Sequence, residues 1–258
     1  HGLAESEMEG LFPQSVILAG FRGSLAHGLY VPPDQPDSTD DKDVMAVCIP
    51  GPESYFGVVE WSGSEHSLNE WDVVCYEFRK FVRLLVKSNP NVLSLLWLRR
   101  QDYLFIDFPG QALLDNRTLF SSKQAYYAFV GYAHGQLHRM THQSYQGYMG
   151  ARRKALVDER GYDTRNAAHL IRLLRMGIEF LRDKELRVFR HDRKELLAIK
   201  HGEWALGRVQ EEANSLFSRA ETALDESSLP VRPDLGAINE LCVRILKQHW
   251  MGTWEWRC

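Results

Sequence analysis

Short apolar runs and one change of hydrophobic period dominate the first part of the chain. Four runs with the composition of β-strands lie at residues 15–20, 44–49, 71–75 and 103–106. After Cys75 the period lengthens and predicts an amphipathic helix over residues 76–87. Its apolar positions follow the spacing i, i+3, i+4, i+7: Phe78, Phe81, Val82 and Leu85. The pattern therefore predicts strands mixed with helices over residues 15–107.

From Ser121 onward the pattern is helical almost throughout. Residues able to cap a helix stand before the apolar periods. The predicted helices begin near Asn89-Pro90, at Ser121 with Gln124 as a capping box, at Asp163, at Asp192 with Glu195, and at Pro233-Asp234, and a further one contains Val209, Leu216 and Leu224. The change of pattern near residues 108–120 predicts two domains, 1–115 and 116–258.

Composition sets the outer limits of the interpretation. The chain has 258 residues, of which 44% are hydrophobic, which is enough for a packed core. The net charge of -3 indicates that any binding of nucleic acid has to come from a local basic patch. None of the four cysteines forms a Cys-x-x-Cys pair, so buried free thiols are expected. No apolar stretch has the length of a membrane span and no signal-peptide pattern is seen, so the expected location is the cytoplasm.

Three acids beside the apolar runs are the main candidates for chemistry. Asp41 and Asp43 lie at the start of the second run and Asp72 at the start of the third. Alternate residues of a strand face the same side, so Asp41 and Asp43 are expected to project together. Two carboxylates that close repel each other unless a cation lies between them. Hard oxygen ligands favour magnesium, with manganese as an alternative.

The same acids suit the transfer of a phosphoryl group from a nucleoside triphosphate. In a two-metal mechanism Asp41 and Asp43 would bridge both ions, and Asp72 would hold the first ion and accept the incoming proton. Gly23 and Ser24 follow the first apolar run, where backbone amides and the serine hydroxyl could approach the β- and γ-phosphates. An Asp-x-Asp pair alone is common in turns, but the ordered combination favours a nucleotidyltransferase.

These stretches resemble the DNA polymerase β-like nucleotidyltransferase superfamily, and within it the predicted RNA-repair-associated nucleotidyltransferases of bacteria and phages. The matching segments are Gly23–Gly28, Asp40–Met45, Trp71–Glu77, Asn89–Leu93 and Ala167–Leu174. The resemblance covers roughly residues 15–245. One departure is the long gap between Ser24 and Asp41, which a proline-rich loop at 31–37 fills.

The resemblance implies an α+β fold and a class of reaction. A mixed N-terminal sheet with flanking helices would be followed by an all-helical domain that forms the other wall of an active cleft. The implied reaction moves NMP from NTP to a hydroxyl group and releases pyrophosphate, with an RNA 3′ end as the favoured acceptor. The oligomeric state and the nucleotide stay open.

One face of the helix that begins at Thr164 carries further candidate residues. Its apolar face is expected to be core, whereas Arg165, His169 and Arg172 lie nearly opposite together with Met176. This face could bind triphosphate or nucleic-acid phosphates, or it could be a solvated surface. Lys154 precedes the helix as a weaker nucleotide-binding candidate. His27, beside the Gly-Ser turn, could contact phosphate or make a structural hydrogen bond.

Other functions stay open on the sequence. The same site could nucleotidylate a protein or a small molecule, or the chain could be a non-catalytic nucleic-acid-binding module. His134, His138 and His142 recur every four residues, a spacing that superficially suggests metal, but a polar or phosphate-facing row fits better because no carboxylate accompanies them. A phosphohydrolase needs His-Asp pairs, of which His191-Asp192 is a lone instance.

Overall fold

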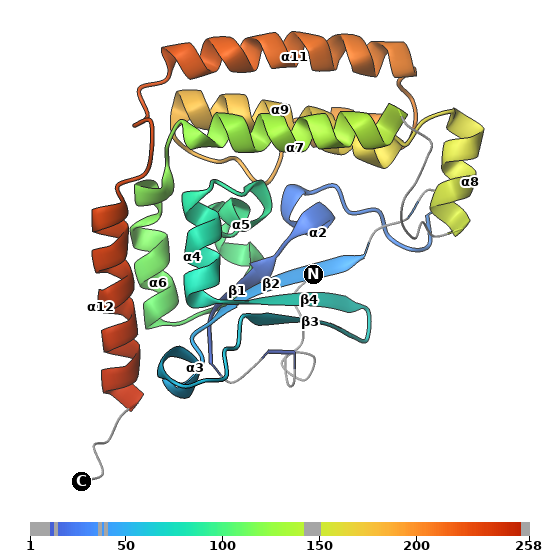
Figure 1. Ribbon diagram of the computed structural model, residues 1–258. Helices are drawn as coiled ribbons and strands as arrows, with labels where there is room; N and C mark the ends of the chain where they lie inside the picture. The colour runs from blue at the N-terminus through green and yellow to red at the C-terminus, as the bar shows by residue number, and fades with distance from the viewer. Residues whose placement is uncertain (1–10, 13–14, 36–37, 39–40, 142–150, 254–258) are drawn as a thin grey trace. The chain divides into compact units, whose positions relative to one another are not determined.

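The structure, a computed structural model, describes residues 11–12, 15–35, 38, 41–141 and 151–253 (Figure 1). Its described residues contain one five-stranded sheet in the order β3-β4-β2-β1-β5. The strands are β1 (Val16–Phe21), β2 (Lys42–Cys48), β3 (Gly63–Leu68), β4 (Trp71–Glu77) and β5 (Tyr103–Ile106). The sheet is mixed, because β2 and β4 run parallel and the other neighbours run antiparallel.

A first group of helices lies between the strands in the chain or packs with them. They are α2 (Gly23–His27), α3 (Glu53–Phe56), α4 (Phe78–Val86), α5 (Pro90–Ser94), α6 (Phe108–Asp115) and α12 (Leu235–Thr253). α4 contacts β2 and β4 through its apolar stripe, and α6 contacts β1. α12, although last in the chain, lies beside α6 (Figure 1).

The remaining helices form a bundle. They are α7 (Gln124–Thr141), α8 (Ala151–Arg160), α9 (Thr164–Asp183), α10 (Arg193–Lys200) and α11 (Leu206–Glu226). α7 and α9 run side by side, and α10 and α11 also contact α9 (Figure 1). The apolar face of α9 is buried as predicted: Ala167, Leu170, Ile171, Leu174, Ile178 and Leu181. The α+β class and the order of a mixed sheet before a helical region are confirmed.

The chain divides into two compact units that do not simply follow its order. One, the sheet unit, draws on residues 1–26, 41–121 and 232–258, and the other, the helical unit, on residues 27–40 and 122–231. The described residues 27–35, which follow the Gly-Ser turn, therefore group with the helices. Lys200 Nζ donates a hydrogen bond to Leu29 O at 2.9 Å, and Arg190 N donates to His27 O at 3.2 Å.

Three of the predicted cap residues accept backbone hydrogen bonds at the starts of their helices. They are Asn89 at α5, Asp163 at α9 and Asp234 at α12. The predicted cap at Ser121 is wrong, since Ser122 Oγ accepts from Gln124 N at 3.3 Å instead. Asp192 stands at the N-cap position of α10, as predicted, but its carboxylate makes no cap bond because it binds the guanidinium groups of two arginines.

Two further expectations bear on the chain as a whole. Cys48 and Cys75 are free thiols and both are buried, as the sequence predicted. In the part of the chain that the structure describes, no helix has the length and apolar character needed to cross a membrane.

Candidate active site

The Gly-Ser turn lies directly against one of the predicted aspartates. β1 ends at Phe21, and α2 begins at Gly23, whose φ of +61° lies in the left-handed region that glycine tolerates best. A Cβ atom at Gly23 would lie 2.5 Å from Asp43 Oδ2, which is closer than real Cβ contacts allow. The sequence requires glycine here for two reasons, the backbone conformation and the approach to Asp43.

Arg22, immediately before the turn, makes an ion pair with Asp43. Its Nε and Nη2 atoms lie 3.3 and 3.2 Å from Asp43 Oδ1, and its backbone N–H donates to Asp43 O at 3.0 Å. The Asp43 side chain is 15% exposed and that of Arg22 is 34% exposed. The sequence analysis missed this residue, although a cation next to a turn that faces acids was a usable signal.

Asp72 lies beside Asp43 in the sheet. The two residues are register partners in the parallel pair of β2 and β4, so their side chains leave the same face of the sheet. Ser67 Oγ, on β3, donates to Asp72 Oδ1 at 2.6 Å. The structure therefore brings together Gly23, Asp43 and Asp72, with Arg22 and Ser67 as partners that the sequence analysis did not name.

Asp41 is placed differently from the other two acids. It precedes β2, whose first register pair is Lys42 with Trp71, and its side chain is exposed. Among the described residues no group of three His, Cys, Asp or Glu side chains is arranged to hold a metal ion, so the three aspartates do not surround a common point. Their shared role as metal ligands stays a prediction.

His27 uses both ring nitrogens within the helical unit. The His27 side chain is buried, Nδ1 lies 2.9 Å from Val188 O, and Nε2 lies 2.5 Å from Arg172 Nη1. Since a guanidinium only donates, Nε2 must accept, and Nδ1 then carries the proton that Val188 O accepts. Burial, and then the charge of Arg172, hold the pKa of His27 well below its usual range. Of the two roles considered, His27 makes the structural hydrogen bonds.

The predicted polar face of α9 is not a solvated surface. Arg172 and Met176 are buried, and Arg172 Nη1 also lies 3.4 Å from Met176 Sδ. His169 and Arg165 are partly exposed. Burial, followed by Arg172, Arg165, His27 and Lys200, holds the pKa of His169 well below its usual range, so its imidazole is neutral at pH 7. The face is therefore electropositive and is buried at Arg172. Lys200, which the sequence analysis did not name, also belongs to this cluster and is buried.

The remaining predicted residues are scattered. Ser24 is partly exposed in α2, and Lys154 is exposed on α8. His134 stacks on Phe217 with ring centroids 4.4 Å apart, His138 is exposed, and His142 lies outside the described residues. Asp192 serves ion pairs, which leaves the His191-Asp192 pair without the arrangement of a phosphohydrolase site.

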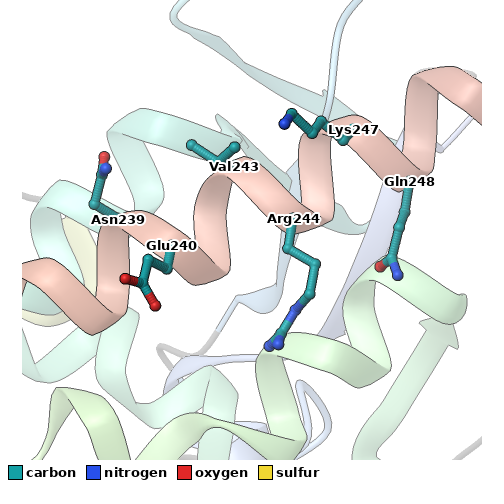
Figure 2. Close-up of a pocket in the computed structure, with 6 residues that line it drawn as sticks. All are labelled: Asn239, Glu240, Val243, Arg244, Lys247 and Gln248. Atoms are coloured by element: carbon teal, nitrogen blue, oxygen red, sulfur yellow. The ribbon is translucent and has the colours of Figure 1, made fainter.

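A hollow of about 440 Å³ lies elsewhere, along the side of α12 (Figure 2). All six of its lining residues belong to that helix: Asn239, Glu240, Val243, Arg244, Lys247 and Gln248. Their charges are mixed, and none of them is a candidate from the sequence. This hollow is therefore separate from the chemistry that the acids and the Gly-Ser turn suggest.

Comparison with known proteins gives a match to one family. Residues 3–244 match the family described as RNA repair pathway DNA polymerase beta family. Among solved structures, a nucleotidyltransferase-like protein from Exiguobacterium sibiricum is similar at 12% identity, over 84% of this chain and 71% of that one, with a TM-score of 0.28. No curated protein matches.

The class of protein follows from the fold, the site and the family match together. A mixed sheet with acids on neighbouring strands beside a Gly-Ser turn defines a nucleotidyltransferase of the polymerase β type. Since the match spans nearly the whole sequence, the chain belongs to the RNA repair pathway DNA polymerase beta family.

Proposed function

We propose that the protein transfers a nucleoside monophosphate from NTP to the hydroxyl group of an RNA 3′ end and releases pyrophosphate, in a magnesium-dependent reaction. The observation that carries the proposal is the contact of the Gly23 turn with Asp43, whose register partner is Asp72. A turn in the left-handed region that brings its backbone up against a carboxylate is an arrangement that a packed core alone does not require.

The donor set suits magnesium. Asp41, Asp43 and Asp72 offer hard carboxylate oxygens, which this ion prefers over nitrogen or sulfur. Asp43 already attracts a cation, since the guanidinium of Arg22 lies at its Oδ1. Asp43 and Asp72, register partners in the sheet, would hold the metal, with Asp41 as the third ligand that the sequence predicts, and the metal would supply Lewis-acid stabilisation of the phosphoryl oxygens.

The chain's own residues have separable tasks in this proposal. Ser24 and the backbone at Gly23 bind terminal phosphates of the triphosphate, because the missing side chain leaves the amides accessible. Asp72 orients the acceptor hydroxyl and takes its proton, with Ser67 holding the carboxylate in place. The assignment of Lys154, Arg165, His169 and Arg172 to nucleotide binding stays a prediction of the sequence.

The test is incubation of the protein with magnesium, each of the four labelled NTPs in turn and a short RNA. We expect label on the RNA, at its 3′ end, with release of pyrophosphate. Label on the protein or on an added small molecule would instead favour nucleotidylation of that acceptor. No label on any acceptor, with RNA binding retained, would favour a non-catalytic binding module and contradict the proposal.

Arg22 provides a prediction about the metal requirement. In Arg22→Met the guanidinium no longer competes for Asp43, so the magnesium concentration for half-maximal transfer should fall about two- to fivefold, the range expected for a partly exposed ion pair. A magnesium titration of activity measures it. Arg83→Met, which removes an exposed cation of α4, is the control and should leave the titration unchanged. A higher requirement in Arg22→Met would show that Arg22 supports the site instead.

A further inference from the structure

Arg172, unlike Arg190 and Arg175, makes no ion pair with an acid in the part of the chain that the structure describes. Arg190 binds Glu179 through Nη1 and Nη2 at 2.7 and 2.9 Å, and its Nε binds Asp192 at 2.8 Å. Arg175 binds Asp192, Glu195 and Glu212. None of the carboxylates in the described residues makes a hydrogen bond or ion pair with Arg172.

The polar atoms of Arg172 are left incompletely bonded. The side chain is 5% exposed, its Nη1 faces His27 Nε2 and Met176 Sδ, and its Nε has no hydrogen-bond partner among the described residues. Burial and then Arg190 lower the pKa of Arg172 to about 9, so the group stays charged at pH 7. A buried charge without a counterion is unfavourable, which indicates that a ligand supplies the counterion.

The surroundings of Arg172 favour an anion. Lys200 lies at the start of α9, where Thr164 Oγ1 donates to Lys200 O at 2.8 Å, and the charges of Arg172, Arg165 and Lys200 all lower the pKa of His169. Asp192, the acid that acts on Arg172, has its oxygens occupied by Arg190 and Arg175. The cluster therefore carries an excess of positive charge within one compact unit.

His27 fixes the orientation of Arg172. Because Val188 O holds the Nδ1 proton of His27, Nε2 is aimed as an acceptor at Arg172 Nη1. This contact occupies one end of the guanidinium and leaves Nε and Nη2, the pair that forms a two-pronged bond with a phosphate group. His27 thus acts as a positioning residue and not as a ligand.

We propose that Arg172, His169 and Lys200, with Arg165 at the margin, form a site for a phosphate group in the helical unit, and that His27 positions Arg172 for it. The anion site stands on these contacts alone, whereas its assignment to a substrate rests on the proposed function. The same phosphate chemistry is offered by the triphosphate of a nucleotide and by the backbone of an RNA.

The experiment measures the melting temperature of the whole protein in EDTA, at constant ionic strength, with tripolyphosphate, ATP or a short RNA. A ligand that binds the folded state raises this temperature by an amount that grows with the logarithm of its concentration divided by its Kd. We expect wild type to be stabilised, and Arg172→Met to lose at least about tenfold in affinity, because a phosphate contact is removed from a buried site. Arg182→Met, an exposed cation on the same helix, should bind as wild type does.

The ligand-free melting temperatures separate a binding role from a structural one. Without anion, Arg172→Met should melt at the wild-type temperature or above it, because an uncompensated buried charge is gone. A lower temperature, together with no anion effect on wild type, would assign Arg172 to the fold and overturn the proposal. If none of the three anions raises the melting temperature of the wild-type protein, the proposal is overturned without any variant.

Comparison of the three added ligands also identifies the source of the phosphate group. A shift with tripolyphosphate and ATP that depends on Arg172 assigns the site to the nucleotide, and a shift with RNA alone assigns it to the acceptor. Binding unaffected by Arg172→Met would place the anion elsewhere and contradict the proposal. Since neither metal nor turnover is needed, loss of nucleotide transfer with anion binding intact would count against the proposed function only.

Discussion

Asp43→Asn should abolish nucleotide transfer while the protein stays folded. The substitution keeps the size of the side chain and an oxygen that can accept from Arg22, but it removes the negative charge that the reaction needs. Loss of one preorganised electrostatic group costs about 10²- to 10³-fold in rate, and in the proposed reaction, where Asp43 would also hold the metal, the loss should be at least about 10³-fold. Initial rates of label transfer at saturating magnesium measure this.

The matched control is Glu65→Gln, which neutralises an exposed acid of the same sheet, on β3. It should transfer nucleotide at the wild-type rate. If Asp43→Asn kept more than about a tenth of the activity, the loss would be no larger than that of a surrounding, non-ligand group, and the acids would have another role.

The ion pair with Arg22 changes the expected effect of this substitution on stability. From the sequence, relief of repulsion between Asp41 and Asp43 would be expected to stabilise the metal-free protein. In the structure Asp41 is exposed outside β2, and Asp43 is neutralised by Arg22. A partly exposed pair contributes about 0–1 kcal/mol, so Asp43→Asn should change the free energy of unfolding by less than about 1 kcal/mol in either direction.

The fold was predictable wherever apolar residues recur with a clear period. β1, β2, β4 and β5 follow from their apolar runs, and α9 follows from its buried stripe and the Asp163 cap. β3 was missed because Gly63–Leu68 is largely polar and exposed, as an edge strand can be when only its backbone is paired. The helix predicted to begin near Asn89-Pro90 is short and ends at Ser94, since Leu95–Trp97 forms a 3-10 turn.

Only those features of the site that depend on nearby residues in the sequence could be predicted. The spacing of Gly23, Asp43 and Asp72 is readable because each lies at the end or start of an apolar strand. The hydrogen-bond partners of His27 could not be predicted from the sequence, because Val188 and Arg172 lie 161 and 145 residues away along the chain. Periodicity placed Arg172 opposite the core face of α9, but it could not show that residues 27–35 group with this helical unit.

Gly23→Ala should reduce both stability and activity. A φ of +61° costs an L-residue about 1–2 kcal/mol, and the added Cβ would lie 2.5 Å from Asp43 Oδ2, so the carboxylate or the turn has to move. A displacement of about 1 Å at reacting groups can cost about 10²-fold in rate. Thermal melts and initial rates of transfer give the two effects separately.

Gly161→Ala separates backbone strain from the collision with Asp43. Gly161 has a similar φ of +77°, but a Cβ there meets nothing within 4 Å. It should lose about 1–2 kcal/mol of stability from the backbone alone and keep its activity. A Gly23→Ala protein that matched Gly161→Ala in both measurements would mean that the turn can yield without disturbing Asp43. The contact between Gly23 and Asp43 would then have no part in holding the Asp43 carboxylate in the position that the reaction with a triphosphate needs.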